Sequence, residues 1–285
     1  MEKLMKLVFM SATLIVIAVI LFMGGYIVIG ALPFFDKVNI ISFLTGTQWN
    51  PSGALFGIFP MLVASILGTA GATIIGVFIG VITAIALVEV FPKSIAKVFS
   101  AAIDLLAGIP SVIYGFWGLM VIVPILGKYF GGKGDGSSLL AVIMILSIMI
   151  LPTIIRMTEV SLRAIPKEYK EGAYALGASK MQYIFKLQLN AAQSGIMTGI
   201  VLGIGRALGE TMAVILVAGN ATIIPTHITD PVRTLTANVA IEMSYATGLH
   251  QQALFATGMV LFALIMGINL VFNYLLTRTE GKRKI

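Results

Sequence analysis

The sequence predicts an all-α integral membrane protein with about six transmembrane helices. Of its 285 residues, 58% are hydrophobic and 11% are charged, whereas roughly a quarter of the residues in an average soluble domain are charged. Several apolar runs reach the roughly 20 residues that a helix needs to cross the hydrocarbon core of a bilayer. The net charge is +7, but the basic residues lie at the ends of these runs. Membrane topology therefore explains them better than nucleic-acid binding does.

Six spans are expected, and they form one membrane domain over 1–285. We place them at about 7–32, 58–88, 103–126, 138–162, 192–218 and 252–276. The first run is too long for the apolar core of a signal peptide and no small-residue cleavage site follows it, so we interpret it as a retained anchor. No repeat with a period of 20–50 residues and no Ser/Gly-rich or Pro-rich linker divides the chain.

The distribution of Lys and Arg predicts the orientation. The N-terminus, the connections after the second and fourth spans and the tail carry thirteen of these residues, whereas the opposite set of connections carries four. Cytoplasmic loops hold the excess of Lys and Arg in membrane proteins. Both termini and 163–190 are therefore expected to face the cytoplasm, with external loops near 33–57, 127–137 and 219–251.

The residue inventory argues against metal and nucleotide sites. There is no cysteine, and His227 and His250 alone are a poor set of metal ligands. The stretch Gly127–Gly134 nearly matches a phosphate-binding P-loop, yet Gly134 stands where Ser or Thr is required and no strand precedes it. We expect a turn at 131–138, no cofactor bound by this chain and no ATPase motif of its own.

The third span is expected to be short or broken at its start. Gly108, Pro110 and Ser111 predict an interruption followed by a helix start, whose free amides attract anions. A simple kink is the alternative, and either form of irregular backbone is tolerated where it lines a cavity. Asp104 is expected to cap the following helix.

Two charged residues lie near the middle of the fifth span. A charge at that depth costs at least about 2.5–3.5 kcal/mol, so Arg206 and Glu210 are expected to face the bundle interior or a water-filled path. Their i, i+4 spacing places them on one face of a continuous helix, where they can form an ion pair. From the residues alone, a pair that clamps helices and a pair that serves transport both remain open.

Two further patterns predict packing in the fourth and fifth spans. Gly195, Gly199 and Gly203 recur every four residues, which favours close approach of a neighbouring helix, in this chain or in a partner. Arg156 and Glu159 lie i, i+3 near the cytoplasmic end of the fourth span and are expected to form a structural pair.

A polar, helix-prone loop at 164–190 connects the fourth and fifth spans. Pro166 suits the first turn of a helix, and acidic residues near that end complement the helix dipole. Gly177 predicts a turn between two short helices. On composition alone, an amphipathic helix on the membrane surface is an equal alternative.

This loop carries a family resemblance. The pattern consists of Glu171-Gly172-Ala173, Gly177, Leu187 and Leu189. It resembles the EAA loop of ABC importer permeases, which implies a type I importer permease (MetI-like) fold. The resemblance also implies that Glu171, Gly172, Ala173 and Gly177 couple the chain to a separate ATPase. Gly172 replaces the Ala that the pattern prefers, and Asn190 stands where Pro is usual.

Three other segments narrow the resemblance to the phosphate permease pair. They are 106–115, 205–214 and 233–238. The Glu-Thr-Met-Ala-Val at 210–214 is similar to the PstC type, whereas the PstA partner tends to carry Glu-Thr-Ala-Pro. The similarity runs from about residue 49 to the end. It implies a multi-pass subunit in the plasma (inner) membrane that works with a PstA-type permease, a pair of PstB-type ATPases and a PstS-type external phosphate-binding protein. ATP and Mg²⁺ would be bound by the ATPase.

The resemblance implies that Arg206 and Glu210 belong to the phosphate path. A guanidinium offers a planar fork of donors that matches phosphate oxygens and stays charged. A neighbouring carboxylate would moderate that attraction, so that phosphate can leave as well as enter. Gly108, Pro110 and Ser111 are candidate backbone contributors to the same path.

Three alternatives remain at this stage. A permease of the same family could carry sulfate or molybdate. Buried charges alone would also suit an ion-coupled secondary transporter, although the six spans contain no visible inverted repeat. An intramembrane enzyme would need a His–carboxylate or Ser–Lys constellation at membrane depth, and none stands out.

Overall fold

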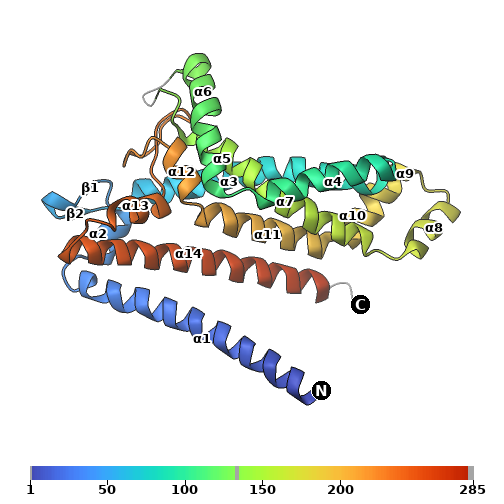
Figure 1. Cartoon of the computed structure of the whole chain (residues 1–285), viewed down its shortest axis with the longest axis horizontal. Coiled ribbons are helices and arrows are strands. Elements are labelled where there is room, and N and C mark those ends of the chain that lie inside the picture. The colour runs from blue at the N-terminus through green and yellow to red at the C-terminus, as the bar shows by residue number, and fades with distance from the viewer. Residues whose placement is uncertain (1, 132–134, 282–285) are drawn as a thin grey trace.

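The structure is a computed structural model that describes residues 2–131 and 135–281, and these ranges are mostly helical (Figure 1). The helices are α1 (Glu2–Phe35), α2 (Ile40–Thr45), η1 (Pro51–Gly53), α3 (Phe59–Ile85), η2 (Ala86–Val90), α4 (Lys93–Gly108), α5 (Ser111–Trp117), η3 (Gly118–Ile122), α6 (Val123–Phe130), α7 (Leu139–Arg163), α8 (Lys167–Ala175), α9 (Lys180–Gln182), η4 (Tyr183–Gln188), α10 (Leu189–Ala191), α11 (Gln193–Gly209), α12 (Met212–Val217), α13 (Leu235–Glu242) and α14 (Gly248–Gly281). One short antiparallel pair, β1 (Trp49–Asn50) with β2 (Leu55–Phe56), precedes α3. Part of the predicted turn at 131–138, and the basic tail residues Lys282, Arg283 and Lys284, fall outside the described residues.

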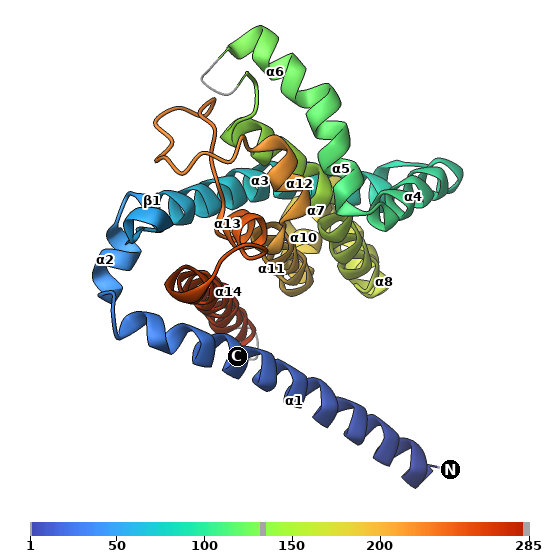
Figure 2. The same ribbon diagram turned by 60° about the vertical axis from the view of Figure 1, so that its left-hand side comes forward.

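Five helices in the described ranges are long and apolar enough to cross a membrane, which confirms the predicted fold class. They are Met5–Phe35, Phe59–Val90, Ser111–Phe130, Leu139–Arg163 and Gly248–Phe272. The third begins at Ser111 rather than at 103, because Pro110 lacks an amide hydrogen and ends the preceding α4. In Figures 1 and 2 the α6 end of this third helix projects from the rest of the bundle.

The predicted fifth span, 192–218, is wrong as a single helix. Helix α11 ends at Gly209, and Glu210 has an extended backbone with φ −70° and ψ 129°. The chain then starts the separate helix α12 at Met212. The segment is therefore a broken helix, a form that membrane proteins tolerate where the freed backbone groups find partners within the protein.

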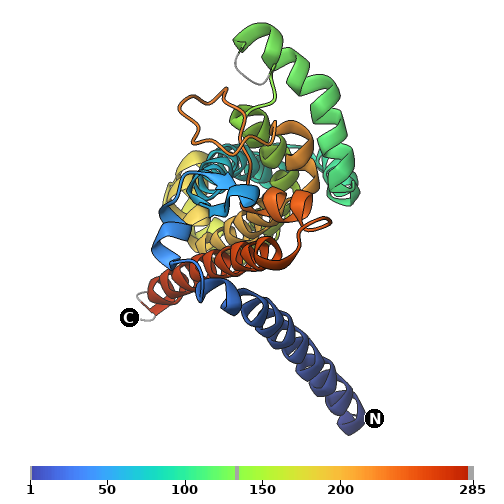
Figure 3. The same cartoon turned by 90° about the vertical axis from the view of Figure 1, so that its left-hand side faces the viewer.

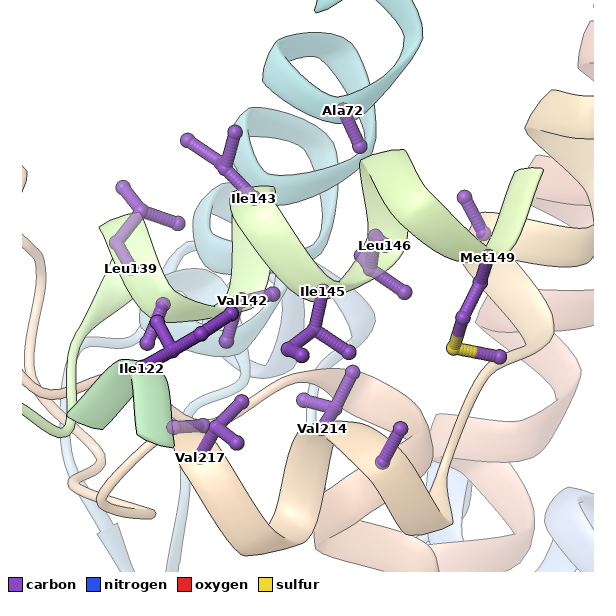
Figure 4. Close-up of a cluster of buried hydrophobic side chains, with 14 of the residues drawn as sticks. Ala72, Ile122, Leu139, Val142, Ile143, Ile145, Leu146, Met149, Val214 and Val217 are labelled. Atoms are coloured by element: carbon purple, nitrogen blue, oxygen red, sulfur yellow. The ribbon is translucent and has the colours of Figure 1, made fainter. Parts of the chain in front are cut away.

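Helix α7 is the centre of the core. Figure 4 shows its apolar side chains between α3 on one side and α12 on the other, with Ile145 facing Val214 and Val217. On α3, a Cβ added to Gly76 would lie 2.8 Å from the side chain of Ile150. Small residues thus let the helix backbones approach closely, which is how membrane helices pack where no hydrophobic force favours their contact.

The predicted glycine stripe of α11 packs on α7 of the same chain. A Cβ added to Gly199 would lie 2.7 Å from the Cβ of Met157, and one added to Gly203 would lie 3.3 Å from Ile154. Gly195 faces Ser161 still more closely. The neighbour that the sequence left open is therefore α7.

Replacing Gly199 with alanine is expected to destabilise the subunit by about 1–3 kcal/mol, the usual cost of forcing an extra group into a packed interface. Thermal unfolding of the purified chain in detergent measures the effect. Gly205→Ala on the same helix is the matched control, since no atom lies within 4 Å of a Cβ added there. Equal transition temperatures for the two variants would contradict the packing described.

The start of α1 and the end of α14 lie at the same end of the bundle. In Figure 1 these two helix ends and helices α8 and α9 are on the right, whereas α2, the β-pair and α13 are on the left. The first half of α1 diverges from the other helices (Figure 3), whereas the second half of α1 contacts α14. There Gly30 lets the ring of Phe255 approach to 2.8 Å of where a Cβ would be.

A buried carboxylate joins four segments at the end of the bundle opposite α8. Glu242 of α13 accepts hydrogen bonds from Trp49 Nε1 (2.9 Å) and Arg233 Nη1 (2.6 Å), and its Oε2 lies 2.8 Å from His250 Nε2. Breaking a buried set of this kind typically costs several kcal/mol because it leaves an uncompensated charge. The cluster therefore fixes the β-pair and the loop before α13 against the start of α14.

Candidate translocation and coupling site

Arg206 lies in the last turn of α11 and is half-buried. Its Nη1 donates to Thr153 Oγ1 of α7 at 3.5 Å, which is at the long limit for a hydrogen bond. Tyr114 of α5 lies within electrostatic range of the guanidinium. The three residues come from three separate helices, so the cation lies at a junction inside the bundle.

The predicted ion pair between Arg206 and Glu210 is not formed. Because α11 ends between them, they no longer share a helix face. Glu210 Oε1 accepts the amide of Ala213 at 3.1 Å and so stabilises the first turn of α12, while its carbonyl accepts Thr236 Oγ1 at 2.9 Å. Within 2–131 and 135–281, no carboxylate forms an ion pair with Arg206. The guanidinium is thus a half-buried cation without an ion-pair partner in this part of the chain.

The interrupted segment before α5 adjoins this junction through Tyr114. Its hydroxyl donates to the carbonyl of Leu106 at 2.7 Å, across the break. Gly108 ends α4, and Pro110 precedes Ser111 at the first position of α5. Within the described ranges, no hydrogen bond joins these three residues to Arg206, and Tyr114 links their segment to the site.

Helices α5 and α12 pack tightly against each other. A Cβ added to Gly115 would lie 2.6 Å from the Cα of Ala213. The helix that follows the first break and the helix that follows the second therefore share an interface. Two breaks that the sequence places about 100 residues apart meet in one region of the bundle.

The loop 164–190 forms the two short helices that the sequence predicts. Helix α8 ends near Gly177, whose φ of +80° is a left-handed conformation that favours glycine. The Ser179 side chain then caps the next helix, in a reciprocal pair of hydrogen bonds with Gln182. A turn with these features holds two helices at a defined angle.

The predicted coupling residues do not all face outward. Glu171, Gly172 and Gly177 are exposed, whereas Ala173 is buried against Tyr183 and Ile184. Next to Gly177, the side chain of Leu176 is 91% exposed. Sequence reasoning did not assign this leucine to coupling.

Glu89, at the end of α3, was also missed. Its side chain is only 6% exposed, and it accepts hydrogen bonds from Lys170 Nζ at 2.6 Å and from Gln188 Nε2 at 2.9 Å. The hydrogen bond that Lys170 donates to Glu89 raises the pKa of Lys170, against an opposing effect of burial. The stability that the Lys170–Glu89 pair gives to the folded state is therefore fully present below the ordinary lysine pKa. It is lost only as the pH rises through the raised pKa of Lys170. Burial raises the pKa of Tyr183 beside this pair.

A second polar network joins α4 to α7. Arg156 pairs with Glu159 at 2.7 Å, as predicted, and with Asp104 of α4 at 2.5 Å. The expectation that Asp104 caps a helix is wrong, because α4 continues beyond it to Gly108 and runs beside α7. Its carboxylate therefore reaches a cation on the neighbouring helix. Among the described residues, no group of three or more His, Asp and Glu side chains is placed to hold a metal ion.

Comparisons with known proteins all find similarity to membrane components of transport systems. The family model described as "Binding-protein-dependent transport system inner membrane component" matches residues 76–281. The chain is 38% identical over 249 residues to the probable ABC transporter permease protein YqgH of Bacillus subtilis, covering 86% of this chain and 80% of that protein. It is 35% identical over 285 residues to the phosphate transport system permease protein PstC of Mesorhizobium japonicum, covering 93% and 85%.

Solved structures show the same fold at lower identity. An inward-facing crystal structure of the MetNI methionine ABC transporter contains a chain that matches with a TM-score of 0.62 and 19% identity. The match covers 81% of this chain and 99% of that one. At this identity the likeness concerns the fold, and it agrees with the predicted MetI-like architecture.

Proposed function

The chain belongs to the family of binding-protein-dependent transport system inner membrane components, and we propose that it is the permease subunit of an ATP-driven importer of inorganic phosphate. Relatives named as phosphate transport system permease proteins PstC are 31–35% identical to it over 85–93% of its length. The observation that carries the substrate class is Arg206, a guanidinium inside the bundle with no ion-pair partner among the described residues.

An unpaired cation at this depth favours an anionic cargo. Keeping it there costs about 2.5–3.5 kcal/mol or more, a cost that an arriving phosphate offsets. Two guanidinium donors can bind two phosphate oxygens, and the Thr153 hydroxyl at 3.5 Å is placed to add another donor. Because the structure provides one such cation here rather than a cage, the contact is weak enough for phosphate to leave.

Glu210 has a different role in this proposal from the one that its spacing indicated. It holds the break between α11 and α12 by accepting the Ala213 amide and the Thr236 hydroxyl. The broken backbone beside Arg206 can then line a water-accessible path. Gly108, Pro110 and Ser111 would line the same path from the start of α5.

The second part of the proposal is coupling. The exposed residues Glu171, Gly172, Leu176 and Gly177 form a tip that would dock onto a PstB-type ATPase subunit, which binds ATP and Mg²⁺ and hydrolyses the nucleotide. A PstA-type permease would supply the other half of the path, and a PstS-type external protein would deliver phosphate. The excess of Lys and Arg at the end that carries α8 and both termini supports a cytoplasmic location for that end.

Uptake of labelled phosphate tests the proposal. In proteoliposomes that contain the chain with its partner subunits and external binding protein, we expect uptake that requires ATP and is not competed by a hundredfold excess of sulfate or molybdate. Preferential uptake of sulfate or molybdate would assign the chain to another oxyanion. Uptake that continues without ATPase subunits would instead indicate an ion-coupled transporter.

A further inference from the structure

We infer that Glu89 is the positioning residue that connects the coupling element, defined here as residues 164–190, to the membrane helix α3. This inference rests on the proposed function, since it names the route by which movement of the coupling element reaches the membrane path. The family pattern at 164–190 does not include Glu89, which lies 81 positions before its partner Lys170.

Glu89 is the point where three segments meet. It lies in η2, the π-helical end of α3, and binds Lys170 of α8 through Oε2 and Gln188 of η4 through Oε1. One carboxylate thus holds both the first helix of the coupling element and the segment by which that element returns to the membrane. π-Helical turns such as η2 and η4 occur frequently at functional sites in helical proteins.

Apolar packing also joins the ends of the coupling element to the end of α3, since Leu87 and Val88 of η2 share an apolar cluster with Ile165 and Leu189. A cavity of about 380 Å³ lies between the end of α3 and α8, lined by Glu89, Lys170, Tyr183 and Gln188 among others. On the α3 side, Ile85 is the residue that packs against the small apolar cluster of Ala173, Tyr183 and Ile184. Because α8 itself faces the cavity, loss of the carboxylate would loosen α8 from the end of α3 while the ends of the coupling element stay packed.

Helix α3 continues from this contact to the opposite end of the bundle. It packs along α7 over most of its length, and near its first turns Ser65 Oγ accepts the amide of Leu235 at 3.0 Å. Leu235 begins α13, directly after the loop that contains Arg233. Packed interiors transmit displacement rather than absorb it. A shift of α8 that pulls on Glu89 would therefore reach the external end of the subunit through one helix.

Glu89→Gln tests the inference in the whole transport complex. We expect the variant complex to assemble and to hydrolyse ATP, while the amount of phosphate moved per ATP falls about fivefold, which corresponds to about 1 kcal/mol, the net contribution of a typical hydrogen bond. Asp104→Asn is the matched control. It also removes a carboxylate that pairs two helices, but it lies outside the coupling element, and it should leave the ratio unchanged.

A cysteine pair separates positioning from folding. The chain contains no cysteine, so Glu89→Cys with Lys170→Cys can be joined by a short bifunctional thiol reagent with a reducible bond. We expect the joined complex to recover most of the wild-type ratio and to lose it again on reduction. Recovery would support the inference even if Glu89→Gln failed to assemble.

Two results would overturn the inference. One is a wild-type ratio in assembled Glu89→Gln, and the other is an unchanged, low ratio after the cysteine pair has been joined. The wild-type complex is measured first in the same vesicles. Absence of ATP-driven phosphate uptake there would overturn the proposed function and this inference with it. If the wild-type complex takes up phosphate normally, an unexpected result with the Glu89 variants overturns this inference alone.

Discussion

Arg206→Gln is expected to reduce phosphate uptake roughly a hundredfold in an assembled complex. The change keeps a polar side chain of similar length but removes the charge and the fork that can bind two phosphate oxygens. Losing about 3 kcal/mol of charge-assisted hydrogen bonding corresponds to roughly two powers of ten. Arg206→Lys should also be impaired, since a point charge does not replace a bidentate donor. Initial rates of labelled phosphate uptake in proteoliposomes measure both variants.

The variant is expected to assemble normally. Arg206 has no ion-pair partner among the described residues, so removing its charge leaves no buried carboxylate without a counter-charge. Removing an unpaired cation from this depth should if anything favour insertion. Lys97→Gln is a control that removes one positive charge from the exposed surface of α4. Loss of assembly in Arg206→Gln, together with normal uptake per assembled complex, would assign the residue to structure instead of transport.

The second large effect is expected at Gly177. Alanine in its left-handed conformation, φ +80°, costs about 1–2 kcal/mol, and the turn can relieve this strain by changing the angle between α8 and α9. We expect binding of the ATPase subunit to weaken roughly tenfold, measured by titrating that subunit onto the permease in detergent. The expected loss of binding comes from the backbone conformation and not from a steric clash, since no atom lies within 4 Å of a Cβ added to Gly177.

Gly172→Ala is the matched control for this prediction. It makes the same chemical change five residues earlier on the same element, also with no atom within 4 Å, but inside α8, where φ is not positive. Gly172 lies in the docking tip, but alanine is the residue that the EAA pattern prefers at this position, so the change should favour the helix by up to about 1 kcal/mol and leave binding of the ATPase subunit intact. Equal binding by the two variants would contradict the role assigned to the turn.

The sequence predicts those parts of this fold that depend on local chemistry. The lengths of the apolar runs predict most of the spans, and Pro110 and Gly177 mark a break and a turn that the structure contains. Arg156 and Glu159 lie one helical turn apart, so their pairing is a local property as well. In each case the deciding interaction lies within a few residues of the feature.

The features that the sequence did not predict depend on distant partners. The apolar pattern continues through 192–218, so it gives no sign that the helix ends at Gly209; the break is held in part by Thr236, 26 residues after Glu210. Likewise Asp104 pairs with a cation 52 residues away, and Glu89 with one 81 residues away. Such contacts require knowledge of which helices are neighbours.

Thiol labelling at position 153 tests most directly whether phosphate meets Arg206. Thr153→Cys places a single thiol beside the guanidinium in a chain without cysteine, and its rate of modification by a small water-soluble reagent is followed in proteoliposomes during turnover. The account predicts that phosphate slows modification, that sulfate does not, and that the protection disappears when Arg206→Gln is added. An unchanged rate with and without phosphate, in vesicles that still take up phosphate, would contradict it.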